Sequence, residues 1–181
     1  MQTMNNDIET VLFSEADLQK RIDELGVELS RDYDGKNPLV IGILKGVVPF
    51  YAAMTLRITV PIQEDFMSIS SYVGTHTTGR ILLRKDLDGD VRGRHVLILE
   101  DVLDSGTTLT AVKQNLLERG AASVKICTLF DKPSGRKMDI SADYVGFLAP
   151  DAFIVGFGLD YNEKYRNLPY VGVLKKEVYT K

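Results

Sequence analysis

Residues 96–109, VLILEDVLDSGTTL, constrain the fold of this chain more than any other stretch. The run from Val96 to Leu99 is apolar without alternation, which is typical of a strand buried on both faces of a mainly parallel sheet. We expect the following carboxylates to end this strand and a helix to run from Thr107 to about Arg119. Helix N–H groups point into the crevice at such a junction, so the stretch predicts a metal-assisted site for a phosphate-bearing ligand.

The remaining elements are consistent with an α/β fold. A strand over 38–44 precedes a helix over 47–57, and a strand over 123–130 follows the central helix, which indicates βαβ units. Ser14 and Asp17 resemble a capping box for a helix that ends near Gly35. Further strands are expected over 62–72, 80–85, 144–148, 153–157 and 170–174. The polar stretch 73–79, with His76 at its tip, is either an ordinary hairpin loop or a flap that closes on a ligand.

Length and composition limit the possible classes of protein. The 181 residues predict a single domain, and a net charge of −3 argues against a protein that mainly neutralises nucleic-acid phosphates. Cys127 is the one cysteine, which excludes an intrachain disulfide, and its apolar surroundings predict a buried core residue. No run reaches about 18 apolar residues and the N-terminus lacks the apolar part of a secretory signal. We therefore expect a cytoplasmic protein that does not span a membrane.

Three carboxylates occupy different places in the central stretch. Glu100 and Asp101 are consecutive, so on a strand they point to opposite sides and cannot both face one metal directly. Sugar hydroxyls, or a metal reached through water, suit them better. Asp104 lies beyond the strand, where the backbone can return its side chain to the crevice, and it is the strongest candidate for an acid or base.

The residues that open the central helix offer two kinds of phosphate donor. Ser105, Gly106, Thr107 and Thr108 supply backbone N–H groups and hydroxyls, and the glycine allows close approach. Simple helix N-capping is the alternative. A Walker loop is excluded because no lysine follows the glycine, and the spacing of Asp101 and Asp104 does not match that of dehalogenase-type phosphatases. In receiver domains the acidic pair follows the first strand, whereas here it lies at mid-chain.

Cations follow two other expected strands. Lys45 directly follows the strand expected over 38–44, and its side chain either contacts an anion there or extends to solvent. The loop 131–137 carries three cations and is either a solvated surface loop or part of the ligand side of the sheet.

The stretch Glu100 to Thr108 resembles the phosphoribosyl pyrophosphate motif of the type I phosphoribosyltransferases. Over about residues 8–178 the chain resembles the bacterial hypoxanthine (guanine) branch of that family, through 44–46, 70–72, 131–133 with Arg136, 153–156, and 159–163 with Arg166. The resemblance implies a mainly parallel central sheet flanked by helices in one domain, 1–181, whose small hood subdomain is formed from N-terminal and C-terminal segments. It also implies Mg²⁺ as cofactor and a homodimer or homotetramer.

The resemblance assigns roles to individual residues. Glu100 and Asp101 would hold the ribose, Asp104 to Thr108 the 5-phosphate, and Asp104 would also handle the purine proton. The remaining implied roles are pyrophosphate binding by Lys45, Gly46, Ser71, Tyr72 and Arg166; purine binding by Lys132, Phe153, Ile154 and Asp160; and metal binding by Glu100, Asp101 and Asp160.

Purine selection follows from hydrogen-bond chemistry. Lys132 can only donate, so it favours a 6-oxo group over the amino group of adenine. Phe153 would stack on the purine, although without the resemblance it is interpreted as a core aromatic. The expected activity is conversion of hypoxanthine, and of guanine, to the nucleotide. The alternatives are a xanthine-preferring enzyme, a nucleotide-sensing regulator of the same fold that binds RNA, and a magnesium phosphohydrolase.

Overall fold

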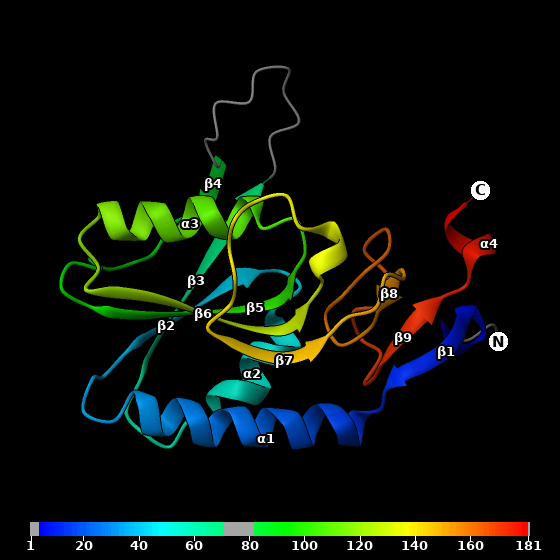
Figure 1. Ribbon diagram of the computed structural model, residues 1–181, viewed down its shortest axis with the longest axis horizontal. Helices are drawn as coiled ribbons and strands as arrows, with labels where there is room; N and C mark the ends of the chain where they lie inside the picture. The colour runs from blue at the N-terminus through cyan, green and yellow to red at the C-terminus, as the bar shows by residue number, and fades with distance from the viewer. Residues whose placement is uncertain (1–3, 71–81, 181) are drawn as a thin grey trace.

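The computed structural model describes residues 4–70 and 82–180 and contains two sheets (Figure 1). The larger sheet has the strand order β4-β3-β2-β5-β6-β7, and only its edge pair, β3 with β4, is antiparallel. Its strands are β2 (Leu39–Leu44), β3 (Gln63–Ser70), β4 (Leu82–Lys85), β5 (His95–Leu103), β6 (Ser123–Asp131) and β7 (Tyr144–Leu148). The expected mainly parallel α/β fold is confirmed.

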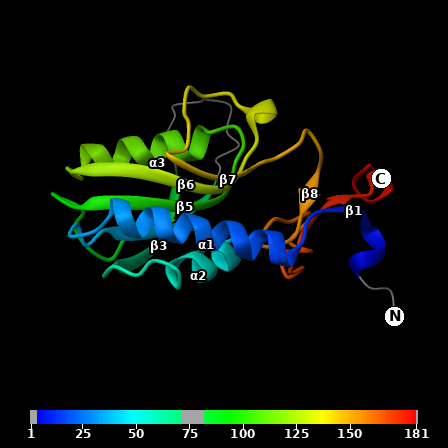
Figure 2. The same cartoon turned by 60° about the horizontal axis from the view of Figure 1, so that its bottom comes forward.

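Helices cover both faces of this sheet. Helices α1 (Glu15–Asp32) and α2 (Val48–Thr55) lie on one face and α3 (Thr107–Glu118) on the other, as Figures 1 and 2 both show. The two apolar layers use alternate residues of β5: Leu97 and Leu99 pack towards α1 and α2, whereas Val96 and Ile98 pack towards α3. This explains why the run has no polar alternation, since both of its faces are buried.

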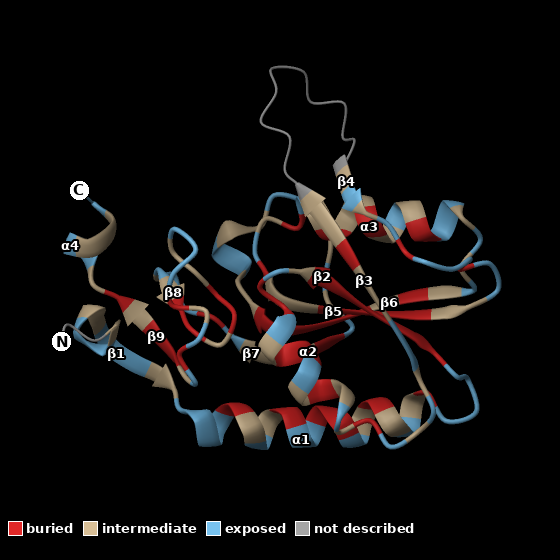
Figure 3. Cartoon of the chain, turned by 180° about the vertical axis from the view of Figure 1, so that it is seen from behind, coloured by how far each residue is buried: buried red, intermediate tan, exposed pale blue. Residues whose placement is uncertain are grey.

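Local signals predicted helix α1 well. Ser14 Oγ accepts a hydrogen bond from Asp17 N at 3.2 Å and Asp17 Oδ2 accepts from Ser14 N at 3.0 Å, which confirms the capping box. The helix ends at Asp32, before Gly35. The buried parts of this helix face the sheet in Figure 3. Its buried apolar residues are Leu18, Ile22, Leu25 and Leu29. Each such burial contributes about 1.5–3 kcal/mol.

The central strand is longer than predicted. Glu100 and Asp101 do not end β5, because parallel pairing with β6 continues to Leu103 opposite Asp131. Cys127, on β6, is fully buried as expected, and burial raises the pKa of its thiol. Among the helices within the described ranges, none is long and apolar enough to cross a lipid bilayer.

A smaller antiparallel sheet joins segments from opposite ends of the sequence. It pairs β1 (Ile8–Phe13) with β9 (Val171–Leu174), and β9 with β8 (Ile154–Val155). Strand β1 was not predicted, because three consecutive residues of its six are exposed and its partner lies over 150 residues away. The predicted strand 153–157 is reduced to β8, because extended backbone stops at Gly156 and Phe157, whose φ values are 105° and 46°. A short helix, α4 (Lys176–Tyr179), follows β9.

Candidate active site

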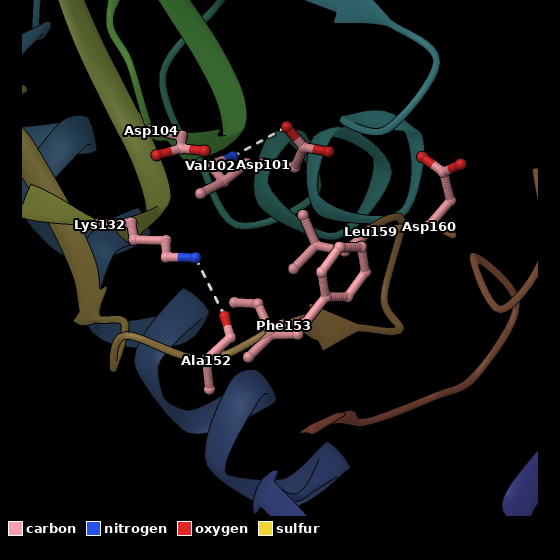
Figure 4. A pocket seen from close by; sticks show the side chains of 9 residues that line it. Asp101, Val102, Asp104, Lys132, Ala152, Phe153, Leu159 and Asp160 are labelled. Carbon is pink, nitrogen blue, oxygen red and sulfur yellow. Dashed lines mark hydrogen bonds between the residues drawn. The ribbon is translucent and has the colours of Figure 1, made fainter. Parts of the chain in front are cut away.

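Two adjoining hollows open where β5 ends. The larger hollow, of about 240 Å³, is lined by Asp101, Val102, Asp104, Lys132, Ala152, Phe153, Ile154, Leu159 and Asp160 (Figure 4). The loop hollow, of about 170 Å³, is lined by Glu100, Val102, Leu103, Asp104, Ser105, Gly106, Thr108 and Leu109. The structure therefore gathers most of the predicted site residues at one edge of the sheet.

The carboxylates divide between the hollows as the strand periodicity predicted. Glu100 lines only the loop hollow and Asp101 only the larger hollow. Asp104, which follows the strand, lines both. Its exposed side chain is thus the one carboxylate among the described residues that borders the two hollows at once.

The loop hollow is built around the start of α3. Gly106 occupies the capping position with φ of 80° and has no side chain that could accept from the helix amides. The Ser105 hydroxyl lies 3.4 Å from Thr107 N, at the limit of a hydrogen bond. The residue at the capping position thus makes no side-chain cap, and the only such contact that the structure describes at this helix start, from Ser105, is long. The helix dipole and the amides of the first turn suit an anion in the hollow.

Arg136 fixes the loop between β5 and α3. Its guanidinium donates to the carbonyl oxygens of Leu103 and Asp104 at 3.0 and 2.8 Å, and it also pairs with Asp131. Gly135 makes room for Asp104, because a Cβ there would overlap the Asp104 carboxylate. The loop after β6 thus positions the loop after β5. Two of the three predicted cations of this loop, Arg136 and Lys132, donate to backbone carbonyl oxygens of the protein.

Burial perturbs both strand carboxylates. Burial, with Asp101 beside it, raises the pKa of Glu100 well above its ordinary value, and Glu100 Oε2 is buried without a hydrogen-bond partner. Burial also raises the pKa of Asp101 to about 6, although Val102 N donates to it and Arg166 opposes the rise. Gly46 packs against Asp101 so closely that a Cβ would overlap its Oδ2. Perturbed carboxyl groups in a cleft are typical of functional sites.

Two predicted cations meet beside the larger hollow. Lys45 Nζ lies 2.8 Å from Glu163 Oε2, and Arg166 Nη2 lies 3.2 Å from Glu163 Oε1. Arg166 also pairs with Asp160 at 2.8 Å. The two cations lower the pKa of Glu163. Glu163 was not among the predicted site residues, although it lies in the stretch that carries Asp160 and Arg166.

Aromatic and lysine side chains form the opposite wall of the larger hollow. Lys132 Nζ donates to the carbonyl oxygen of Ala152 at 3.0 Å and faces the hollow (Figure 4). Phe153 stacks on Tyr179 at 4.9 Å between ring centroids and meets the edge of Tyr161 at 5.6 Å. Phe153 is 38% exposed, so its interpretation as a core aromatic is wrong. Tyr179, which does not line the hollow, could not be found from motif spacing.

Ser71 and Tyr72 of the predicted site lie outside the described residues, and so does the stretch 73–79 with His76, which was expected to be a hairpin loop or a flap. Within 4–70 and 82–180, no group of three or more His, Cys, Asp or Glu side chains is arranged to hold a metal. Beside phosphates, Mg²⁺ commonly takes most of its ligands from substrate and water. The unpartnered Glu100 oxygen and the neighbouring carboxylates are hard oxygen donors that fit this ion.

Comparison with known proteins agrees with this geometry. Residues 13–162 match the family model of the phosphoribosyl transferase domain. The chain is 54% identical over 177 residues to the hypoxanthine-guanine phosphoribosyltransferase of Bacillus subtilis, covering 97% of this chain and 98% of that protein. It is 51% identical over 180 residues to the bifunctional protein TilS/HprT of Listeria monocytogenes, covering 99% of this chain and 28% of that protein. A crystal structure of a hypoxanthine phosphoribosyltransferase from Staphylococcus aureus matches with a TM-score of 0.95 at 48% identity, over 99% of this chain and 98% of that one.

Proposed function

This chain belongs to the phosphoribosyltransferase family, and on that premise we propose that it is a purine-salvage enzyme. It converts hypoxanthine, and guanine, with 5-phosphoribosyl 1-pyrophosphate (PRPP) to IMP or GMP and pyrophosphate. The proposal is supported by the full-length similarity to hypoxanthine-guanine phosphoribosyltransferases. The observation that carries it is the position of Asp104 between the loop hollow and the larger hollow.

The loop hollow is suited to the 5-phosphate of PRPP. The backbone N–H groups and hydroxyls at 105–108 donate to phosphate oxygens, and the α3 dipole favours the negative charge. Glu100 and Asp101 hold the ribose hydroxyls from the two sides of β5. The sugar then lies above the end of the strand, between the two hollows. Its reactive carbon faces the larger hollow, where the purine binds.

Group transfer passes through a centre with oxocarbenium character, so the site must orient both reactants and manage one proton. The purine ring nitrogen attacks the ribose carbon as the bond to pyrophosphate breaks. Asp104 takes the proton from the purine ring, because its carboxylate borders both substrates. Lys45, Gly46 and Arg166 bind the departing pyrophosphate, with Ser71 and Tyr72 from the segment outside the described residues.

Mg²⁺ is the proposed cofactor. Bound Mg²⁺ would neutralise negative charge on the pyrophosphate leaving group. Glu100, Asp101 and Asp160 are the residues that would hold it, directly or through water. Asp101 and Asp160 line the same hollow, whereas Glu100 faces the other. Because these carboxylates are divided between two hollows, we propose that substrate oxygens are the main ligands of Mg²⁺.

Purine selection uses the wall formed by Lys132 and Phe153. Lys132 already donates to Ala152, and its remaining N–H groups are available to a 6-oxo group. The ring of Phe153 stacks on the purine, and the Ile154 backbone meets its edge. Asp160 lines the same hollow. Adenine is disfavoured because its amino group offers no acceptor to Lys132.

The organisation of the chain supports further parts of the proposal. We assign residues 1–181 to one domain, with the sheet of β1, β8 and β9 as its hood. The proposed partners are the small-molecule substrates and further copies of the chain in a homodimer or homotetramer, without nucleic acid or membrane. The proposed location is the cytoplasm.

The test combines the protein with PRPP, Mg²⁺ and one of hypoxanthine, guanine, xanthine or adenine, and measures nucleotide formation by chromatography. We expect IMP and GMP, little product from adenine, and loss of activity on chelation of Mg²⁺. Preference for xanthine would change the assigned base. Phosphate release without purine, or salt-sensitive RNA binding without nucleotide formation, would replace the proposal with a phosphohydrolase or a regulator.

A further inference from the structure

The carboxylate of Glu163 lies between the two cations proposed to bind pyrophosphate. Its Oε2 contacts Lys45 Nζ at 2.8 Å and its Oε1 contacts Arg166 Nη2 at 3.2 Å. Lys45 follows β2, 118 residues away in sequence from Glu163. These contacts therefore join two distant parts of the chain. A carboxylate that bridges two cations with both oxygens occupies the kind of position that a pyrophosphate oxygen pair would take.

The backbone holds Glu163 in this position. Asn162 and Glu163 have φ values of 51° and 61°, in the left-handed region that residues other than glycine rarely adopt. The turn is closed by hydrogen bonds between Tyr161 and Lys164, and Glu163 N donates to Asp160 Oδ2 at 2.9 Å. Unfavourable backbone conformations of this kind cluster at ligand sites. The turn directs Glu163 to the cations at a cost in conformational energy.

The Glu163 contacts are weak enough to be exchanged for a ligand. The side chains of Lys45 and Glu163 are 70% and 64% exposed, so water screens their attraction. The pair of Arg166 with Asp160 is less exposed, at 26% and 27%. Arg166 also donates to the carbonyl oxygen of Gly158 at 2.8 Å. Arg166 thus stays in place when Glu163 leaves.

We propose that Glu163 is a positioning residue whose carboxylate substitutes for pyrophosphate in the ligand-free protein. It keeps Lys45 close to the anchored Arg166 at the pyrophosphate position, and the incoming pyrophosphate group displaces it. This inference rests on the proposed function and adds that a side chain of the protein competes with pyrophosphate for the two cations. Glu163 weakens binding of pyrophosphate, both as part of PRPP and as the product, and thereby favours product release.

The variant Glu163→Gln separates competition from positioning. Glutamine keeps the shape and can still accept from Lys45, but it removes the charge. We expect inorganic pyrophosphate with Mg²⁺ to bind the variant about two- to fivefold more tightly in calorimetry, the range for one exposed ion pair. The KM for PRPP should fall similarly and the KM for hypoxanthine should not change. The difference should shrink at high salt, as competition between charges requires.

A matched control is Glu24→Gln, because Glu24 is also an exposed glutamate paired with an arginine, Arg21, at 2.8 Å. It should bind pyrophosphate as the wild type does. Equal or weaker pyrophosphate binding by Glu163→Gln, beside an active wild type, would overturn this inference alone. A wild type that forms no nucleotide and binds no pyrophosphate would overturn the proposed function together with it.

Discussion

The loop hollow and the larger hollow share Val102 and Asp104 but are built in different ways. The loop hollow is lined by one continuous stretch, residues 100–109, in which a strand meets a helix. The larger hollow is assembled from four separate stretches, around 101–104, 132, 152–154 and 159–160. The loop hollow is therefore a local property of a strand–helix junction. The larger hollow exists only because β5, β6 and the small sheet are packed together.

The two hollows also differ in charge. Glu100 faces the loop hollow, and no cation within residues 4–70 and 82–180 lines that hollow. The larger hollow brings Asp101 and Asp160 close to Arg166, and Lys132 lines its other side. An anion in the loop hollow would thus meet backbone amides and a helix dipole, whereas a ligand in the larger hollow would meet side-chain charges. Substitutions in one hollow or the other should accordingly affect the use of PRPP and of the purine to different extents.

The largest effect is expected from Asp104→Asn, because Asp104 serves both hollows. Turnover should fall by about 10²- to 10⁴-fold, the range for loss of a general base, while PRPP still binds. Steady-state kinetics together with calorimetric titration of PRPP provide the measurement. Unchanged turnover would remove Asp104 from proton transfer.

Gly106→Ala should damage the loop hollow alone. An added Cβ would lie 2.5 Å from Ile140 Cγ2 at a residue with φ of 80°. We expect kcat/KM for PRPP to fall by about 10²-fold through displacement of the phosphate-binding backbone. Gly93→Ala is the matched control, because its φ is 72° and nothing lies within 4 Å of the added carbon. If both variants lose activity equally, backbone strain rather than site geometry is responsible.

Asp101→Asn should stabilise the ligand-free protein in a pH-dependent way. Burial raises the pKa of Asp101 to about 6, so the native state binds its proton more tightly than the unfolded state does. Stability of the wild type therefore falls as the pH rises from about 4 to about 6 and then levels off. The variant should gain about 1–3 kcal/mol in free energy of unfolding above pH 6 and little below pH 4. Its PRPP binding should weaken.

Denaturant unfolding across pH measures this gain. Asp90→Asn, which alters an exposed aspartate 3.9 Å from Arg92, is the control and should change little. A gain for Asp101→Asn that is independent of pH would show that packing, not buried charge, causes it.

Lys132→Gln should have the smallest effect and act on the larger hollow alone. An amide can donate and accept, so discrimination between hypoxanthine and adenine should narrow by about tenfold, the value of one hydrogen bond. The comparison uses kcat/KM for each base, with the KM for PRPP as the internal control. A variant with the wild-type preference would contradict the role of Lys132 in base selection.

Some of this site could be predicted because it depends on residues close in sequence. The period of a strand alone places Glu100 and Asp101 on opposite sides, and the structure confirms that placement. Spacing also identified Asp104 and the start of α3 at Thr107. The roles of these residues remain predictions that the experiments above test.

Other features depend on contacts between distant segments. Strand β1 was missed because its pairing with β9 determines it. Phe153 was interpreted as a core aromatic because its sequence neighbours do not reveal that its ring stacks on Tyr179 and that the residue lines a hollow. The contacts of Glu163 with Lys45 likewise span the chain.

The sequence by itself determined the strand–helix junction at residues 96–109 and the division of its carboxylates, since periodicity and capping act within a few residues. Only the tertiary structure decided that the side chains of Lys132, Phe153, Asp160 and Glu163 lie beside that junction. These contacts join residues that are far apart in sequence, so forming them costs loop-closure entropy. The packing of the whole sheet and its hood, rather than any local preference, determines which of these contacts form.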